Sequence, residues 1–137
     1  SEGRGTTRPF EIIGSPWINP FTLADILNSL SLQGVKFRPL YFVPTFSKYK
    51  DENCGGVQVH IIDRDKFNPI KTALNVISTL KDLYPNYFQL NRHFDLLMGT
   101  DKVREALSDS SSVDEIILSW KDDLLEFSQL RLNYVLY

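Results

Sequence analysis

The 137-residue sequence has one cysteine, two histidines and no long apolar run. One cysteine excludes an internal disulfide and a zinc site built from several cysteines. The two histidines, His60 and His93, do not make a metal site by themselves, so we expect neither a metal nor another cofactor. No stretch approaches the eighteen apolar residues of a membrane span. The pattern of a secretory signal peptide is not visible either, so an export signal would have to precede residue 1.

The sequence also lacks an excess of either charge. Lysine and arginine total 15, aspartate and glutamate total 17, and the formal net charge is −2. A nucleic-acid-binding domain ordinarily carries a basic surface, so we expect no nucleic-acid partner. The length suits one domain with its own hydrophobic core and is too short for two ordinary ones.

Strand and helix patterns alternate in the first two thirds of the chain. Asn19-Pro20 predicts a helix start, with asparagine as the N-cap and proline in the first turn. Residues 35–43 and 57–62 alternate in the manner of strands, and residues 10–13 are a candidate third strand. A second helix is predicted to begin at Asn68-Pro69, with Asn68 as its cap. Its apolar stripe consists of Ile70, Ala73, Leu74, Ile77, Leu80 and Tyr84.

The last third is predicted to be mainly helical. Residues 87–95 are aromatic and irregular, and a short helix follows from Thr100 or Asp101 to Leu107. Ser112 and Glu115 form a capping box that starts a final helix. Its predicted buried residues are Val113, Ile116, Ile117, Trp120, Leu124 and Phe127. We therefore predict an α+β fold, with a small sheet of two to four strands covered by about four helices in a single domain.

The first seventeen residues gather polar groups suited to a ligand. Two glycines bracket Arg4, so the backbone there can adopt positive φ or approach a ligand closely. The side chains of Glu2, Arg4, Thr6 and Arg8 can donate to and accept from a sugar, a phosphate or a carboxylate.

The alternative is a frayed chain end, because no apolar residue precedes Phe10. On this basis we expect Ser1–Thr7 to be mobile in the isolated domain. Phe10, Ile12 and Trp17 should be the first residues held by packing.

Three other positions are candidates on pattern alone. Gln58 and His60 alternate with the apolar residues of their strand, so both point to its other face, where they could bind sugar hydroxyls. His60 could also transfer protons. The alternative is that this face of the sheet is an ordinary solvated one. Trp17 follows Pro16 in a predicted loop and could stack on a sugar. Cys54 is expected to be a buried thiol rather than a nucleophile.

Several blocks follow one another in the order found in one protein family. Together they resemble the C-terminal part of the bacterial NamZ-type exo-β-N-acetylmuramidases, long described as a domain of unknown function. The resemblance runs nearly end to end, through Ser1–Thr6, Pro9–Glu11, Gly14–Trp17, Phe42–Tyr49, Cys54–His60, Asp63-Arg64, Gly99–Asp101 and Arg131–Tyr137.

The resemblance implies that residues 1–137 are the C-terminal-type domain of a larger two-domain enzyme, whose upstream Rossmann-like domain is absent from this chain. The implied reaction releases terminal β-linked N-acetylmuramic acid from peptidoglycan, in a cleft between the two domains. The parent protein is expected to be periplasmic or secreted. The alternative is a non-catalytic glycan-binding, lid or interaction module.

For the site, the resemblance favours Glu2 as one of the two carboxylates that a glycosidase commonly needs, with the second one upstream. His60 is a weaker catalytic candidate. Arg4 or Arg8 would pair with the lactyl carboxylate of muramic acid. The expected substrate-binding residues are Arg4, Thr6, Arg8, Trp17, Gln58 and His60.

Overall fold

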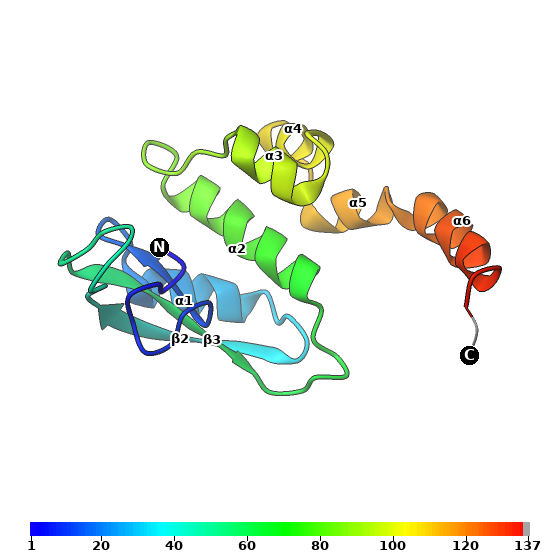
Figure 1. Cartoon of the computed structure of the whole chain (residues 1–137). Helices are drawn as coiled ribbons and strands as arrows, with labels where there is room; N and C mark the ends of the chain where they lie inside the picture. The colour runs from blue at the N-terminus through cyan, green and yellow to red at the C-terminus, as the bar shows by residue number, and fades with distance from the viewer. Residues whose placement is uncertain (136–137) are drawn as a thin grey trace. The chain divides into compact units, whose positions relative to one another are not determined.

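A computed structural model describes residues 1–135 (Figure 1). Leu136 and Tyr137, which end the last block of the family resemblance, lie outside the described residues. The chain divides into two compact units, Ser1–Gln89 and Leu90–Tyr137. The predicted α+β class is confirmed, with a three-stranded antiparallel sheet in the first unit.

The sheet of the first unit has the order β1-β3-β2. Its strands are β1 (Ile12–Ser15), β2 (Val35–Phe42) and β3 (Cys54–Ile61). The candidate third strand therefore exists, although it starts two residues later than expected. β3 begins at Cys54 and not at Val57, because the glycines at 55 and 56 pair with β1 and β2 as extended backbone. Apolar alternation does not detect this part of the strand, because glycine has no side chain.

Two helices accompany the sheet, α1 (Pro20–Ser29) and α2 (Pro69–Leu83). The predicted caps are confirmed: the side chain of Asn19 accepts hydrogen bonds from two main-chain N–H groups of α1, and Asn68 accepts one from Lys71. Helix α1 packs on β2, β3 and α2. The shared core consists of Ile18, Leu23, Ala24, Leu27, Val35, Phe37, Val57, Val76 and Leu80. On α2, Leu74 and Leu80 are buried as predicted, whereas Ile70 and Ala73 are exposed.

The described part of the second unit, residues 90–135, contains four short helices, α3 (Arg92–Met98), α4 (Lys102–Ser108), α5 (Val113–Leu118) and α6 (Lys121–Leu132). The stretch 87–95 is thus not wholly irregular: Asn91 caps α3, and Gly99 in the left-handed region ends it. The predicted Ser112–Glu115 capping box is present at α5.

The predicted final helix is divided at Ser119 and Trp120, so its apolar stripe does not continue along one face. Val113 and Ile116 of α5 are buried as expected. In α6, however, Leu124 is 57% exposed and Phe127 is 61% exposed, so the prediction that both are buried is wrong.

The sheet has two chemically different faces. Strand alternation sends Phe37 and Val57 into the core, and sends Arg38, Gln58 and His60 to the opposite, outer face. At the other end of the outer face, Ile12, Phe42 and Cys54 form a small apolar cluster. Cys54 is fully buried as expected, and burial raises the pKa of its thiol.

Candidate functional site

The opening segment, residues 1–10, is held to the first unit by main-chain hydrogen bonds. Ser1 and Gly14 exchange a pair of them, at 2.7 and 3.0 Å, and the Phe10 N–H donates to the Glu2 carbonyl at 2.8 Å. The structure thus shows an anchored segment in place of the expected mobile one. Phe10 is 68% exposed, so the expectation that packing holds it is wrong, whereas Ile12 is buried as expected. The anchors are main-chain groups, which apolar patterning does not report.

Gly5 brings the opening segment onto the loop 44–53. Its carbonyl accepts hydrogen bonds from the Thr45 N–H at 2.9 Å and the Thr45 hydroxyl at 3.0 Å. Gly5 has φ +80°, and a Cβ there would lie 2.7 Å from both the nitrogen and the oxygen of Phe46. The loop itself is strained, because Ser47, Tyr49 and Asp51 have positive φ. Strained non-glycine residues of this kind concentrate at functional sites.

We expect Gly5→Ala to detach the opening segment from this loop without unfolding the unit, since the atoms nearest to the new Cβ belong to the Thr45–Phe46 main chain. Hydrogen exchange of the Thr45 amide should become faster, while amides of β3 keep their protection. Unchanged exchange at Thr45 would contradict the role given to Gly5. Gly99→Ala is a suitable control, because a Cβ at Gly99 meets nothing within 4 Å.

Glu2 and Arg4 form an ion pair on the opening segment. Arg4 Nε lies 2.7 Å from Glu2 Oε1, and the two side chains are 54% and 38% exposed. The Arg4 guanidinium also lies over the Phe10 ring, 5.3 Å from its centroid. The carboxylate is therefore positioned by a neighbour and remains partly open to a ligand.

The pKa of Glu2 lies below its ordinary value. Burial acts to raise it, but the main-chain N–H of Glu2, the Lys48 ammonium, the terminal ammonium of Ser1 and the Arg4 guanidinium together outweigh that effect. Glu2 is thus ionised at neutral pH, which suits a base, a nucleophile or an electrostatic stabiliser rather than a proton donor. Lys48 was not predicted as a site residue from the sequence, although it lies in Phe42–Tyr49, one of the stretches that resemble the family.

Gln58 lies on the predicted outer face but is only 2% exposed. Its Oε1 accepts a hydrogen bond from Arg38 Nη2 at 2.6 Å, and its Nε2 donates to Glu11 Oε2 at 3.2 Å. Arg8 Nη1 donates to the same Glu11 oxygen at 3.1 Å. Gln58 therefore organises the charged groups around it and does not itself face solvent. Glu11 and Arg38 were missed from the sequence, although strand alternation puts Arg38 on this face.

His60 shares the outer face and stands opposite Lys36 in the strand register. Its Nε2 is enclosed and has no hydrogen-bond partner among the residues that the structure describes. The described residues therefore offer this nitrogen no neighbour with which it could exchange a proton. The catalytic assignment of His60 stays a prediction.

Thr6 and Trp17 mainly serve the local structure. The Thr6 hydroxyl donates to the Gly3 carbonyl at 2.6 Å and accepts from the Arg8 N–H at 3.1 Å, which closes the turn between them. Trp17 packs on the core as expected, with its ring stacked on Tyr87 at 5.7 Å and tilted against Tyr84 at 5.1 Å. These two rings cover part of the indole, so stacking on a sugar would have to use the part that they leave exposed.

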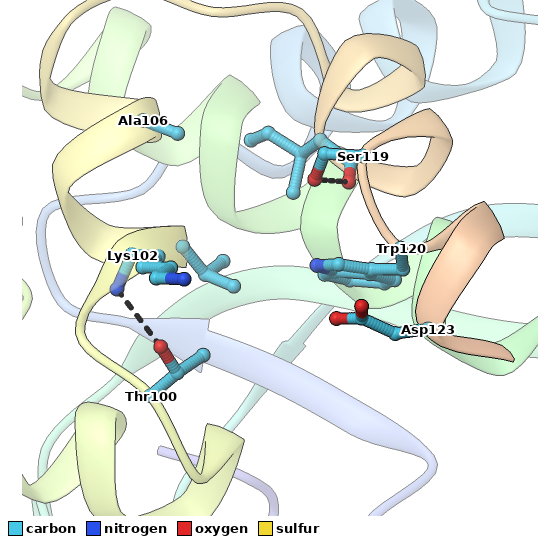
Figure 2. Close-up of a pocket in the computed structure, with 8 residues that line it drawn as sticks. Thr100, Lys102, Ala106, Ser119, Trp120 and Asp123 are labelled. Atoms are coloured by element: carbon cyan, nitrogen blue, oxygen red, sulfur yellow. Dashed lines mark hydrogen bonds between the residues drawn. The ribbon is translucent and has the colours of Figure 1, made fainter. Parts of the chain in front are cut away.

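A separate cavity of about 300 Å³ lies within the second unit (Figure 2). None of the candidate residues above lines it. Trp120 was predicted to lie in the core, but it is only half-buried. Figure 2 shows it beside Asp123 and facing the α4 residues of the cavity wall. The lining residues are Thr100, Lys102, Val103, Ala106, Ile116, Ser119, Trp120 and Asp123.

Residues 1–135 contain neither a metal-ligand cluster nor a membrane-spanning helix. In that range, no three histidine, cysteine, aspartate or glutamate side chains are grouped so as to hold a metal ion. No helix of the same range is long and apolar enough to cross a bilayer.

Comparison with known proteins gives one consistent result. The family described as "Exo-beta-N-acetylmuramidase NamZ, C-terminal" matches residues 1–137. The peptidoglycan β-N-acetylmuramidase NamZ of Bacillus subtilis (strain 168) is 48% identical over 139 residues, which cover 100% of this chain and 34% of that protein.

The crystal structure of a DUF1343 family protein from Bacteroides fragilis NCTC 9343 superposes with a TM-score of 0.87 at 34% identity. The match covers 98% of this chain and 37% of that one. The chain thus spans about a third of the length of both relatives. These matches confirm the resemblance expected from the sequence blocks: the chain belongs to the NamZ exo-β-N-acetylmuramidase family and corresponds to its C-terminal region.

Proposed function

We propose that residues 1–137 are the C-terminal domain of a peptidoglycan-degrading glycoside hydrolase that releases terminal β-linked N-acetylmuramic acid. In this proposal the domain supplies one wall of a cleft, and an upstream Rossmann-like domain supplies the other. Family membership supports the reaction class. The observation that carries the proposal is the carboxylate of Glu2, held 2.7 Å from Arg4 Nε and 38% exposed.

The state of Glu2 narrows its role in this reaction. Glycosidases commonly use one carboxylic acid as proton donor and one carboxylate as base or nucleophile, about 5–10 Å apart. Since the pKa of Glu2 is lowered, Glu2 fits the second role. The proton donor then belongs to the upstream domain. No metal or cofactor takes part in the proposed reaction, because carboxylate-based glycoside hydrolysis needs none.

The remaining candidates divide into groups that contact the sugar and groups that shape the site. Arg4 faces Glu2 with its Nε and its side chain is 54% exposed, so its terminal nitrogens can reach the lactyl carboxylate. Arg8, Trp17 and His60 are proposed to line the sugar. The other two predicted substrate-binding residues, Thr6 and Gln58, position neighbouring groups through hydrogen bonds of 2.6–3.2 Å.

The proposal predicts how Lys48 affects the pH dependence of the full-length enzyme. The Lys48 charge lowers the pKa of Glu2, so the ionised form persists to lower pH. Lys48→Gln should therefore move the acid limb of kcat/KM to higher pH, because Glu2 would then take up a proton earlier as the pH falls. Lys50→Gln removes the same charge from a side chain paired with Asp51, and should leave the limb in place. An acid limb that responds equally to both variants would argue against Glu2 as the titrating group.

We expect the isolated 137-residue chain to fold without turning over substrate. Its first unit has a continuous core, which favours cooperative melting, while half of the proposed cleft is absent. The direct assay compares the isolated chain and the full-length protein on a chromogenic N-acetylmuramic acid glycoside. Turnover by the isolated chain would show that the upstream domain is dispensable. A binding signal with no activity even in the full-length protein would favour the alternative, a non-catalytic glycan-binding or lid module.

A further inference from the structure

Arg38 differs from the other arginines that make side-chain contacts in the described chain. Arg4 is paired with Glu2, Arg8 with Glu11 and Arg104 with Asp95, each through a nitrogen within 3.1 Å of a carboxylate oxygen. Arg38 is bound only by the amide oxygen of Gln58, at 2.6 Å. A neutral acceptor orients a guanidinium but leaves its charge uncompensated.

Gln58 fixes the position of Arg38. A polar side chain that is only 2% exposed must satisfy its hydrogen bonds within the protein, because an unmade bond there is costly. Gln58 does so by accepting from Arg38 and donating to Glu11. Arg38 itself is exposed, so its remaining N–H donors are presented to solvent from a rigid strand.

The surroundings of Arg38 are locally basic. Lys36 precedes it by two residues on β2, is exposed and faces the same side of the sheet. Arg8, Lys36 and Arg38 thus place three positive charges around the carboxylate of Glu11, in a protein whose net charge is −2. Glu11 is paired with Arg8, and among the described residues no ion pair joins Glu11 to Arg38.

We propose that the outer face of the sheet carries a carboxylate-binding site centred on Arg38. The Arg38 guanidinium binds the ligand carboxylate, Lys36 adds attraction, and Gln58 is the positioning residue. A lactyl carboxylate on a sugar and the carboxylate of a short peptide share this chemistry. The site is defined by binding and does not depend on the proposed hydrolysis.

The test is an NMR titration of the ¹⁵N-labelled chain with three probes: N-acetylmuramic acid, N-acetylglucosamine and N-acetylalanine. The Arg38 Nε–H and Gln58 side-chain amide signals should shift with the two carboxylates and stay in place with N-acetylglucosamine. Arg38→Gln should raise the Kd for the carboxylates roughly 10-fold or more, as for other charge-assisted contacts, and Arg38→Lys by less. Arg64→Gln, which removes the same charge from the exposed loop after β3, should leave the Kd unchanged.

The probes also separate the two sources of the carboxylate. Tighter binding of N-acetylmuramic acid than of N-acetylalanine identifies a sugar-borne lactyl group, and equal binding identifies a general carboxylate site. The inference is overturned if no carboxylate shifts these signals, or if Arg38→Gln binds as the unmodified chain does. It is also overturned if Arg4→Ala abolishes binding while Arg38→Gln does not, because the carboxylate would then bind at the opening segment. Failure of the proposed hydrolysis would appear separately, in turnover by the full-length protein.

Discussion

Glu2→Gln in the full-length protein is expected to lower kcat by about 10²–10⁴-fold, the usual contribution of a catalytic acid or base. The substitution keeps the size of the side chain and its ability to accept from Arg4 Nε, but removes the negative charge on which the proposed role depends. Substrate binding should therefore change little. Steady-state kinetics on a muramic acid glycoside, together with a binding measurement, separate the two effects.

Glu52→Gln is the matched control for this variant. Glu52 is an exposed glutamate on the loop that receives the opening segment, so the substitution makes the same change of charge nearby. Its kcat should stay within about twofold of the unmodified enzyme, as for most exposed substitutions. If Glu2→Gln behaves like Glu52→Gln, the domain acts as a scaffold or lid, and catalysis belongs to the upstream domain.

Gly56→Ala is expected to destabilise the domain by roughly 3 kcal/mol, the upper part of the usual range for overpacking. An added Cβ would collide with the Ile13 carbonyl oxygen and lie 2.7 Å from the Cα of Gly14. Both atoms belong to β1, which pairs with β3 at this point, so the strands would have to move apart. The ladder that anchors the opening segment would be disturbed as well, since Ser1 bonds to Gly14.

The measurement is urea unfolding of the isolated chain, compared with Gly99→Ala. At Gly99 there is open space, and the added Cβ costs only the strain of its positive φ, about 1 kcal/mol. The free energy of unfolding should therefore fall clearly further for Gly56→Ala. Equal losses would mean that β1 can shift without penalty, and that the close approach of the two strands is not required.

The sequence predicted those features that depend on near neighbours along the chain. Asn19 and Asn68 were identified as caps because a capping side chain bonds to N–H groups two or three residues on. Gln58 and His60 were assigned to one face because side chains alternate along a strand. The α+β class followed from the same local patterns.

The missed features depend on contacts between distant segments. Glu11 and Arg38 meet at Gln58 only because β3 lies between β1 and β2, and no local pattern gives that strand order. Lys48 acts on Glu2 from a different loop. The opening segment is anchored by main-chain groups, so its low content of apolar residues gave the opposite expectation. In α6, an apolar spacing that suggested burial belongs to a helix exposed along its whole length.

The central claim is that the opening segment forms a wall of the substrate cleft in the longer protein. A crystal structure of the full-length protein with N-acetylmuramic acid bound tests it most directly. We predict that the Glu2 carboxylate will lie within about 3.5 Å of the anomeric carbon, or be joined to it through one water, because reacting groups must be held in contact. A bound sugar whose anomeric carbon faces other carboxylates, with Glu2 turned away into solvent, would contradict the account.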